Sequence, residues 1–561
     1  LRVDKLIEVA KASGADAVHP GYGFLSENAD FAQAVIDAGL TWVGPPPGAI
    51  RSLGSKSSAK QIALSQGVPC LPGYWGADQS DERFVAEAGR IGFPVMVKAA
   101  AGGGGRGMRL VTEASQLRDA IASARSEALS AFGSGELLVE RALLNPRHVE
   151  VQVFADGRGN CIHLGERDCS VQRRHQKLIE ESPGPAVDAA LRDRMGRCAV
   201  DLAKAAGYVG AGTVEFLLQG DEFFLMEMNT RLQVEHPVTE MVTGLDLVEW
   251  QLRVARGEAL PLSQEQVKFG GHAIEVRLCA EDENFVPHSG NVLRFDVGDA
   301  CHAGDASVRF DHAIETGTRV SPYYDSMLGK LIAHAATREE AIAQLAGALD
   351  QLVVLGIPTN RQLLAASLRH PVFFCGDATI AFVAEHAVEI RAGIEARERA
   401  IALAAGLAAI YGGVSRAASL ACPFTRPVVL RHRATMIAAR IEGSVLDSVR
   451  VSSVRLPTGA WHVQSSGIDL VVEDASFDPA GQGGNTRAVN ELRAPFNGKV
   501  IAIKATAGAA VVRGDTLLVL ESMKLEHALC ASRDGVVEAI HVEPGQQAAT
   551  AQVLITFEAT P

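Results

Sequence analysis

Two similar segments flank a single lysine near the C-terminus, and this symmetry is the strongest constraint on the fold. The segments begin at Gly498 and Gly535, and in each a second glycine follows ten residues later, at Gly508 and Gly545. The pattern predicts short paired strands, with Lys524 at the hairpin between two half-units. A lysine on an exposed tight turn between rigid strands suits covalent attachment of a carrier group rather than a core contact.

This pattern resembles the biotin carboxyl carrier domain, whose attachment site reads Met-Lys-Met or Met-Lys-Leu. Met523-Lys524-Leu525 takes that position here, and Ala494-Pro495 lies at the expected distance upstream. The tripeptide alone would favour an ordinary surface lysine by roughly ten to one, and the flanking repeat reverses those odds. A lipoyl domain has the same fold, but its modified lysine is usually flanked by Asp and Ala. The resemblance implies biotin attached covalently to Lys524.

Length and charge limit the class of protein. The 561 residues predict about three to four domains. A net charge of −13 argues against a nucleic-acid-binding protein that relies on a basic surface, although a few local cations can hold a nucleotide.

The nine cysteines form no Cys-x-x-Cys pair, so a reducing compartment fits best. The longest apolar run, Ala400 to Tyr411, is too short to span a bilayer, and we expect no membrane partner.

Helical and strand patterns alternate over the first 55 residues, which predicts a parallel sheet with crossover helices. The chain opens on a helical pattern at Leu1, and we expect it to lack a first βα unit. Further on, Ala381 to Ile410 predicts a long helix, and residues 427–472 are rich in strand patterns. The glycine-rich segment 478–485 is typical of a flexible linker.

A glycine run, Gly102 to Gly105, follows the predicted strand Phe93 to Lys98. Glycines let backbone N–H groups approach phosphate oxygens closely. The spacing is not that of a Walker motif, and a mobile loop explains a glycine run equally well. Lys98 ends the strand that enters this loop and is well placed to meet phosphate charge, and Lys56 is a second candidate cation.

Polar and apolar residues alternate from Leu225 to His236. The polar positions are Glu227, Asn229, Arg231, Gln233 and Glu235. If the stretch stays extended, a period of two places all five on one face. A half-buried strand with a solvated outer face is the simpler explanation of the alternation alone.

A preceding predicted strand, Gly212 to Leu218, weakens that simpler explanation. A three-residue turn centred on Asp221 would place Glu215 opposite Glu227, whereas a two-residue turn at Gly220-Asp221 would put them on opposite faces. Two facing carboxylates repel each other without a cation. Their adjacency would therefore imply a bound divalent metal, Mg²⁺ or Mn²⁺ with nucleotide phosphates.

Residues 1 to about 390 resemble the ATP-grasp core of biotin carboxylase. The matching segments are His19 to Asn28, Lys98 to Met108, Asn145 to Glu150, Glu166 to Lys177, Glu227 to Glu240 and Tyr323 to Met327. So many segments in the right order make coincidence negligible. With the carrier domain, most of the chain resembles the α-subunit of an acyl-CoA carboxylase of the propionyl-CoA or 3-methylcrotonyl-CoA type.

The resemblance implies a multidomain protein of α/β and α+β class. The expected parts are a truncated pre-ATP-grasp α/β domain (1–55), an ATP-grasp domain (56–265), a C-terminal biotin carboxylase domain (266–390), a small helix-plus-β domain for β-subunit docking (391–480), a linker (481–490) and an all-β biotinyl/lipoyl-like carrier domain (491–559).

The same resemblance implies residue roles. Those expected at ATP are Lys56, Lys98, Gly104, Gly105, Glu140, Arg141, Ala142, Leu143, His148, His175 and Glu215. Those expected at Mg²⁺ or Mn²⁺ are Glu215, Glu227 and Asn229. Those expected at bicarbonate are Lys177, Arg231 and Val234. Glu235 matches the general base and Arg309 the arginine that contacts biotin; the catalytic set is then Lys177, Arg231, Glu235 and Arg309.

These residue types suit the chemistry. Bicarbonate is a poor nucleophile until its last proton is removed, and a neighbouring carboxylate can take that proton. Attack on the γ-phosphate builds charge that a divalent cation and lysines offset. Breakdown of the carboxyphosphate gives CO₂, and an arginine stabilises the charge on biotin's ureido oxygen during attack. From the residues alone, a surface ion pair with Asp311 explains Arg309 better.

We therefore expect ATP- and bicarbonate-dependent carboxylation of biotin on Lys524. No second large domain follows Pro561, so we expect transfer to propionyl-, 3-methylcrotonyl-, acetyl- or geranyl-CoA on a separate carboxyltransferase β-subunit, in a hetero-oligomer that a biotin protein ligase modifies. The alternatives are another ATP-grasp ligase and a biotin carrier with an inactive ATP-grasp part. A bacterial cytoplasm is the expected compartment, and a mitochondrial matrix also fits.

Overall fold

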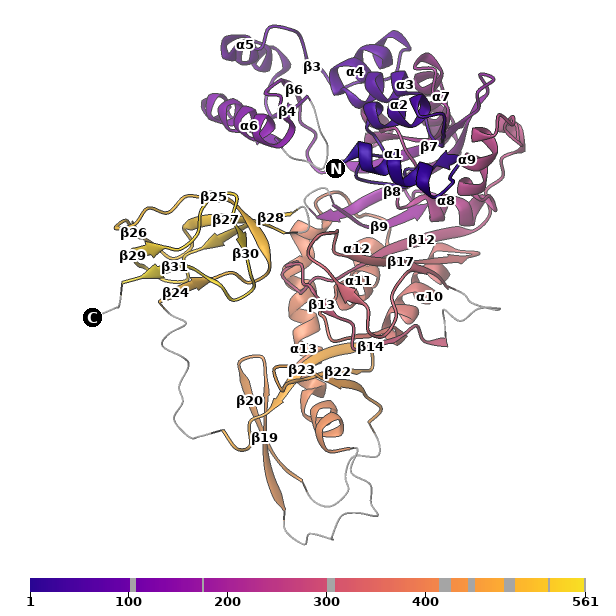
Figure 1. Cartoon of the computed structure of the whole chain (residues 1–561). Coiled ribbons are helices and arrows are strands. Elements are labelled where there is room, and N and C mark those ends of the chain that lie inside the picture. Colours follow the sequence, from indigo (N-terminus) through magenta and orange to yellow (C-terminus); the bar gives the residue numbers. More distant parts are fainter. Residues whose placement is uncertain are drawn as a thin grey trace. The chain divides into compact units, whose positions relative to one another are not determined.

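The computed structural model divides the chain into two units (Figure 1). The residues that it describes are 1–100, 107–173, 176–299, 308–412, 425–441, 449–478, 490–522 and 525–558. The first unit comprises residues 1–276, 332–343 and 370–387, and the second comprises residues 277–331, 344–369 and 388–561.

The first unit begins with alternating helices and strands. These are α1 (Val3–Ala12), β1 (Ala17–Val18), α2 (Ala29–Asp37), β2 (Thr41–Trp42) and α3 (Pro47–Gly54). Strands β1 and β2 pair in parallel, which confirms the predicted crossover arrangement. Asn28 caps α2 by accepting the backbone N–H of Phe31 at 2.7 Å.

A four-stranded sheet in the order β3-β6-β4-β5 follows. Its elements are β3 (Gly73–Tyr74), α5 (Asp81–Ile91), β4 (Val95–Ala99), β5 (Arg109–Val111), α6 (Leu117–Phe132) and β6 (Leu137–Arg141). Val95, Val97 and Val139 enter the hydrophobic core that this sheet shares with α5 and α6. Because side chains alternate along a strand, Lys98 and Glu140 are left on the opposite face.

The larger sheet of the first unit carries the order β11-β10-β7-β8-β9-β12. Its strands are β7 (Arg147–Ala155), β8 (Cys161–Arg173), β9 (Gln176–Ser182), β10 (Gly210–Gln219), β11 (Glu222–Asn229) and β12 (His272–Cys279). On one face Val151 and Phe216 pack in a core with α4 (Lys56–Ser65) and α7 (Ala189–Ala205). The alternate residues, among them Glu150 and Glu215, therefore lie on the other face, and they too are buried.

The β10–β11 turn contains only Gly220-Asp221, the case that the sequence predicts to separate the two carboxylates. The three-residue alternative is therefore wrong. However, a β-bulge adds Met226 to β11, and Glu215 and Glu227 are register partners after all. The facing of the two carboxylates is confirmed, and its cause is the bulge rather than the turn.

The extended interpretation of residues 225–236 is wrong beyond Asn229, where β11 ends. Arg231 lies in a bend, and Glu235 is the N-cap residue of α8 (His236–Thr243). A further helix, α9 (Leu247–Ala255), packs against β10. The polar residues of this stretch are therefore brought together by a turn and a helix start, not by a single strand face.

Later elements follow in chain order. They are β13 (Gly290–Asn291), β14 (Arg294–Asp296), β15 (Val308–His312), β16 (Arg319–Val320), β17 (Met327–Ala335), α10 (Arg338–Gln351), β18 (Val353–Leu355), α11 (Arg361–Leu368), α12 (Pro371–Phe374) and α13 (Phe382–Tyr411). Helix α13 confirms the predicted long helix. No helix in the described part of the chain is both long and apolar enough to cross a membrane.

A five-stranded sheet follows α13 in the order β20-β19-β23-β22-β21. Its strands are β19 (Arg426–His432), β20 (Thr435–Ile441), β21 (Ser452–Arg455), β22 (Trp461–Ser465) and β23 (Ile468–Asp474). Ala405 of α13 packs in one core with Val463 and Leu470, so the helix and the sheet form one layer pair. The predicted strand-rich character of residues 427–472 is confirmed.

Strands alone make up the regular structure in the described residues from 491 to 557, yellow in Figure 1. They are β24 (Glu491–Arg493), β25 (Gly498–Ile503), β26 (Ala510–Val511), β27 (Thr516–Ser522), β28 (Leu525–Cys530), β29 (Gly535–Ile540), β30 (Gln547–Ala548) and β31 (Val553–Phe557). They form two four-stranded sheets, β24-β31-β29-β26 and β28-β27-β25-β30.

The predicted symmetry of this region is confirmed by a reciprocal pair of backbone hydrogen bonds. Gly508 N–H donates to the Val537 carbonyl at 2.8 Å, and Gly545 N–H donates to the Val500 carbonyl at 2.7 Å. Both glycines have positive φ, 81° and 88°, a conformation that favours glycine. Each half-unit therefore closes on the other.

Ser522 pairs with Leu525, so β27 and β28 form the predicted hairpin on either side of residues 523–524. Lys524 itself lies outside the described residues, as do Gly104, Gly105, His175 and nearly all of the expected linker.

Packing beneath the larger sheet generates a stability prediction. Leu218 of β10 is 2% exposed, and Leu218→Ala would leave a cavity there. We expect it to lower the free energy of unfolding of the first unit by about 2–5 kcal/mol. Leu252→Ala on α9, where the leucine is 42% exposed, removes the same atoms and should cost less than about 1 kcal/mol. Thermal denaturation followed by circular dichroism measures both, and equal midpoints would contradict the assignment of this core.

Candidate active site

The ammonium group of Lys177 on β9 is shared among three buried carboxylates. Its Nζ donates to Glu215 at 2.9 Å, to Glu235 at 2.6 Å and to Glu150. Burial opposes a charge on Lys177, but the three carboxylates outweigh it and raise its pKa well above the usual value. Lys177 is therefore a permanently charged centre on the buried polar face of the larger sheet.

Glu215 on β10 collects further donors. Its carboxylate accepts hydrogen bonds from the side-chain amides of Asn229 and Gln233, each at 2.8 Å, and Nε2 of His148 lies 3.1 Å away. Burial would raise the pKa of Glu215, but Lys177 and His148 hold it well below its usual range. Glu215 is thus an ionised carboxylate even though it is buried.

The facing carboxylates have cations of the protein beside them, which corrects the argument that their adjacency alone implies a metal. Glu227 lies 3.4 Å from Nζ of Lys56, the first residue of α4, and Glu215 has Lys177. The donor set nevertheless fits a hard divalent cation. Glu215, Glu227 and Asn229 present carboxylate and amide oxygens from one strand pair.

Arg231 is held in a bend after β11 by Glu27, whose carboxylate accepts from Nε at 3.0 Å and from the Thr230 N–H at 3.0 Å. The guanidinium also donates to Oδ1 of Asn229 at 3.3 Å. Burial opposes its charge, but the carboxylates of Glu27 and Glu235 raise its pKa. Glu235 follows Val234 in a turn, contacts Lys177 directly and raises the pKa of Arg231 through its charge.

The fully buried Arg167 of β8 organises the same face. Nε donates to Glu150 at 2.5 Å, and Nη2 donates to Gln233 at 3.2 Å. Three further acceptors complete its surroundings, Gln152, Thr239 and Thr213. Glu150 and Gln233 in turn bond Lys177 and Glu215, so Arg167 acts one step behind the residues expected to touch substrate.

A second buried charge cluster lies on the smaller sheet. The carboxylate of Glu140 pairs with the ammonium groups of both Lys98 and Lys60. Burial alone would raise the pKa of Glu140, but the two lysines lower it to about 2. The backbone N–H groups of Arg141 and Ala142 donate to the carbonyls of Pro72 and Pro94, which fixes the strand end that Leu143 follows. The predicted phosphate-binding Lys98 is therefore held by a carboxylate.

Arg309 lies on β15 in the second unit and makes a two-pronged ion pair with Asp311, both contacts at 2.8 Å. Lys330 lies 3.8 Å from the same carboxylate. This is the ion pair that the residues alone predict. The contact of Arg309 with biotin that the resemblance implies stays a prediction.

Glu150, Arg167 and Lys60 were given no role from the sequence. The first had a signal, because His148, Glu150 and Gln152 alternate with valines along β7. Such alternation is more often a solvated face. Here Glu150 and Arg167 are fully buried, and this depends on strand pairing that no local pattern specifies.

Sequence models of four protein families match the chain in succession. They are the biotin carboxylase N-terminal domain (1–50), the carbamoyl-phosphate synthase L chain ATP-binding domain (55–263), the biotin carboxylase C-terminal domain (275–385) and the biotin-requiring enzyme domain (488–557). The fold and site therefore define a biotin carboxylase joined to a biotin carrier domain.

Relatives match almost the whole length of the chain. The methylcrotonoyl-CoA carboxylase α-subunit of Mus musculus is 39% identical over 100% of this chain and 85% of its own length. The propionyl-CoA carboxylase α chain of Ruegeria pomeroyi is 39% identical over 99% of this chain and 91% of its own. The chain belongs to the α-subunits of biotin-dependent acyl-CoA carboxylases, which are ATP-dependent ligases.

Solved structures agree over the carboxylase part. A biotin carboxylase complex with an ATP analogue from Campylobacter jejuni has a TM-score of 0.66 and 46% identity, over 69% of this chain and 86% of that one. The biotin carboxylase domain of a 2-oxoglutarate carboxylase from Hydrogenobacter thermophilus, with MgADP and bicarbonate, has a TM-score of 0.66 and 42% identity, over 68% and 84%.

The Glu140 cluster generates a prediction about pH. Glu140→Gln would leave two buried ammonium groups without an anion, and near pH 7 we expect a loss of roughly 3 kcal/mol in the free energy of unfolding. The folded pKa of about 2 lies below the ordinary 4.5, so this stabilisation is present above about pH 4.5 and disappears as pH falls towards 2. The gap between wild type and variant should therefore narrow over that window.

Urea denaturation at a series of pH values measures this gap. Glu222→Gln, at an exposed position on β11, is the matched control and should follow the wild type at every pH. A gap that stays constant down to pH 3 would show that the carboxylate is not held ionised by the two lysines.

Proposed function

We propose that this chain uses ATP and bicarbonate to carboxylate biotin held on Lys524, and that the carboxyl group then passes to an acyl-CoA on a separate carboxyltransferase β-subunit. The observation that carries the proposal is the contact between Lys177 Nζ and Glu235 Oε1, which lie 2.6 Å apart. It couples a buried cation, which attracts a small anion, to a carboxylate that can accept the proton of that anion.

Bicarbonate is held in this proposal by Lys177, Arg231 and the backbone at Val234. When the Lys177 ammonium turns from Glu235 towards the anion, the Glu235 carboxylate loses its ion pair and becomes a stronger base. It can then take the bicarbonate proton at the oxygen that Lys177 now contacts. Before the anion arrives, the carboxylates of Glu150, Glu215 and Glu235 raise the Lys177 pKa, so the lysine meets the anion as a cation.

Nucleotide phosphates are assigned to Lys56, Lys98 and His148, together with Gly104 and Gly105, and the nucleotide itself to residues 140–143 and His175. Glu215, Glu227 and Asn229 would hold Mg²⁺ or Mn²⁺, which offsets phosphate charge when bound. Complexes of the two solved biotin carboxylases with an ATP analogue and with MgADP support this assignment. Before a nucleotide binds, the ammonium groups of Lys56 and Lys177 compensate the negative charges of Glu227 and Glu215.

The acceptor of the carboxyl group and the protein partners are proposed from the names of the relatives. The names of the mouse and Ruegeria proteins support methylcrotonoyl-CoA or propionyl-CoA as acceptor. We assign β-subunit docking to residues 391–480, biotin contact to Arg309, and modification of Lys524 to a biotin protein ligase. The domain limits and the bacterial or mitochondrial compartment stay predictions.

The test separates catalysis from attachment. Wild type should hydrolyse ATP in a bicarbonate-dependent manner that free biotin stimulates. Glu235→Gln removes the base and should lower this activity by about a hundredfold or more. The measurement is phosphate release with and without bicarbonate.

Lys524→Arg is the control for that experiment. It should retain the activity towards free biotin and lose all streptavidin signal after expression with a biotin ligase. Full activity in Glu235→Gln would remove the base assignment, and an undiminished streptavidin signal in Lys524→Arg would remove the attachment assignment.

Arg167 generates a prediction about positioning. Arg167→Met frees Glu150 and Gln233, which hold Lys177 and Glu215. We expect kcat/KM for bicarbonate to fall about tenfold to a hundredfold, the loss typical of a residue that positions the groups touching substrate. The KM for ATP should change less, and the pH profile of the reaction should shift. Arg167→Lys should restore part of the loss.

The matched control is Arg192→Met. Arg192 also pairs with a buried glutamate, Glu166, at 2.6 Å, and its variant breaks an ion pair of the same kind outside the site. If both variants changed the bicarbonate and ATP constants equally, Arg167 would have only a structural role.

A further inference from the structure

One carboxylate beside the proposed bicarbonate site has no part in the reaction described above. Glu27 lies between β1 and α2, 204 positions before Arg231 in the sequence. Its Oε2 accepts from Nε of Arg231, and its Oε1 accepts from the backbone N–H of Thr230, both at 3.0 Å. The carboxylate therefore bridges the side chain of Arg231 and the backbone next to it.

The segment that carries Glu27 is fixed on both sides. The backbone N–H of Ser26 donates to the carbonyl of Gly23 at 3.0 Å. The N–H of Asn28 donates to the carbonyl of Leu25 at the same distance, and the Asn28 side chain caps α2. Glu27 therefore reaches Arg231 from a backbone that is fixed independently of the arginine.

The three nitrogens of the Arg231 guanidinium are held unequally. Nε has the 3.0 Å contact to Glu27, whereas Nη2 lies 3.3 Å from Oδ1 of Asn229 and Nη1 lies 3.4 Å from the Leu232 carbonyl. Distances above about 3.2 Å are at the weak end for N–H···O hydrogen bonds. The Nη groups are therefore the donors that an incoming anion can engage with the smallest loss of existing contacts.

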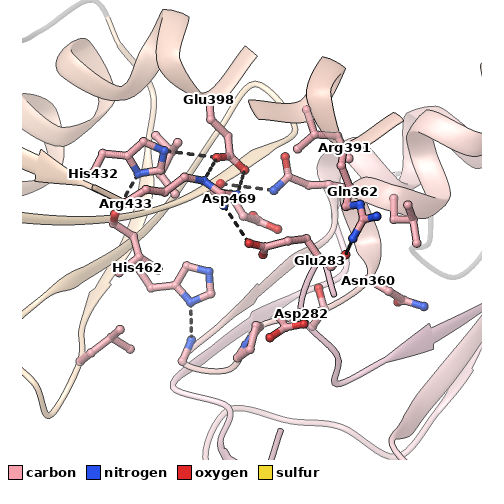
Figure 2. Close-up of a pocket in the computed structure, with 18 of the residues that line it drawn as sticks. Asp282, Glu283, Asn360, Gln362, Arg391, Glu398, His432, Arg433, His462 and Asp469 are labelled. Atoms are coloured by element: carbon pink, nitrogen blue, oxygen red, sulfur yellow. Dashed lines mark hydrogen bonds and ion pairs between the residues drawn. The ribbon is translucent and has the colours of Figure 1, made fainter. Parts of the chain in front are cut away.

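Arg433 of the second unit shows a different arrangement (Figure 2). Its Nε and Nη2 donate to Glu398 at 2.8 and 3.2 Å, and its Nη1 donates to Glu283 at 2.8 Å. Every nitrogen of this guanidinium is bound to a carboxylate, as expected of an arginine with a structural role. Arg231 differs because its carboxylate takes only Nε and leaves the two Nη groups to weaker contacts.

We propose that Glu27 is a positioning residue, which holds Nε of Arg231 and so presents the two Nη groups to bicarbonate. The inference rests on the proposed function, which assigns bicarbonate to Arg231. A guanidinium with a fixed orientation can offer two parallel N–H groups to a planar anion. Without Glu27 the side chain would populate several orientations, and binding would have to order it at an entropic cost.

The charge of Glu27 by itself would have the opposite effect on an anion. A carboxylate near the site repels bicarbonate, so its removal would strengthen anion binding if charge alone mattered. However, the Glu27 side chain is 40% exposed, and its charge is therefore screened by water and salt. We expect the orienting effect to exceed the repulsion. The two roles thus predict opposite signs for the change in bicarbonate affinity.

Glu27→Gln tests this sign in the full chain. The amide preserves the size of the side chain, but it has one acceptor oxygen and cannot accept from both Thr230 and Arg231 through separate oxygens. In ATP hydrolysis with free biotin, we expect the KM for bicarbonate to rise about tenfold, with kcat and the KM for ATP within about twofold of the wild type. Glu27→Asp retains the carboxylate and should recover part of the loss.

Glu258→Gln is the matched control. Glu258 accepts from Nε of Arg253 on α9 at 2.9 Å, and its side chain is 42% exposed. The variant therefore breaks an ion pair of the same kind and exposure outside the site, and it should keep the wild-type KM for bicarbonate. Unchanged far-UV circular dichroism would show that all the variants fold.

The inference is overturned if Glu27→Gln leaves the KM for bicarbonate unchanged or lowers it, or if Glu258→Gln raises it equally. An equal rise in the KM for ATP would also overturn it, because the variant would then have disturbed the site as a whole. Failure of the proposed function looks different, since the wild type itself would then hydrolyse ATP without dependence on bicarbonate. That result would remove the inference together with its basis.

Discussion

The rest of the active site depends on the ammonium group of Lys177. Taking several charges out of water is expensive, and a buried cluster is tolerated only when each member has partners of good geometry. Lys177 supplies three contacts, to Glu150, Glu215 and Glu235, and Arg167 supplies five more behind it. Removing one member would leave an uncompensated buried charge. The charged residues of this face therefore stabilise one another, and Lys177 and His148 keep the pKa of Glu215 low although its carboxylate is buried.

Such a set demands exact strand register, because a slip of one residue moves every side chain to the other face. The β-bulge at Met226 is how the chain meets this demand. The two-residue turn at Gly220-Asp221 would by itself put Glu215 and Glu227 on opposite faces. The extra residue restores their pairing, and it lies next to the proposed metal ligands, in keeping with the common use of bulges to re-aim side chains.

The sequence predicts those parts of the molecule that local periodicity controls. Glu227 and Asn229 share a strand face as their spacing predicts, and Gly508 and Gly545 occupy equivalent places in the two carrier half-units. Glu235 lies beside Lys177 for a reason that its spacing does not predict, because it is placed there by the start of α8 and not by a strand face.

Other features depend on contacts between residues far apart in the chain. Arg167 meets Gln233 across 66 positions, and in the charged run from Glu166 to Asp168 it looks like a solvent-facing residue. Lys60 meets Glu140 across 80 positions. Neither pairing has a local signature. What distinguishes these residues is burial, which only the packed sheets determine.

The two half-units of the carrier region are joined by backbone hydrogen bonds, and this bears on how an attached biotin can move. The reciprocal bonds from Gly508 to Val537 and from Gly545 to Val500 join the two half-units in both directions. Opening one half would break the closure of the other, and β27 and β28 stay paired as far as Ser522 and Leu525. A biotin carried there cannot travel by deforming its own domain. The prediction that assigns this movement to the chain before Glu491 rests on the composition of residues 481–490, which is typical of a flexible linker.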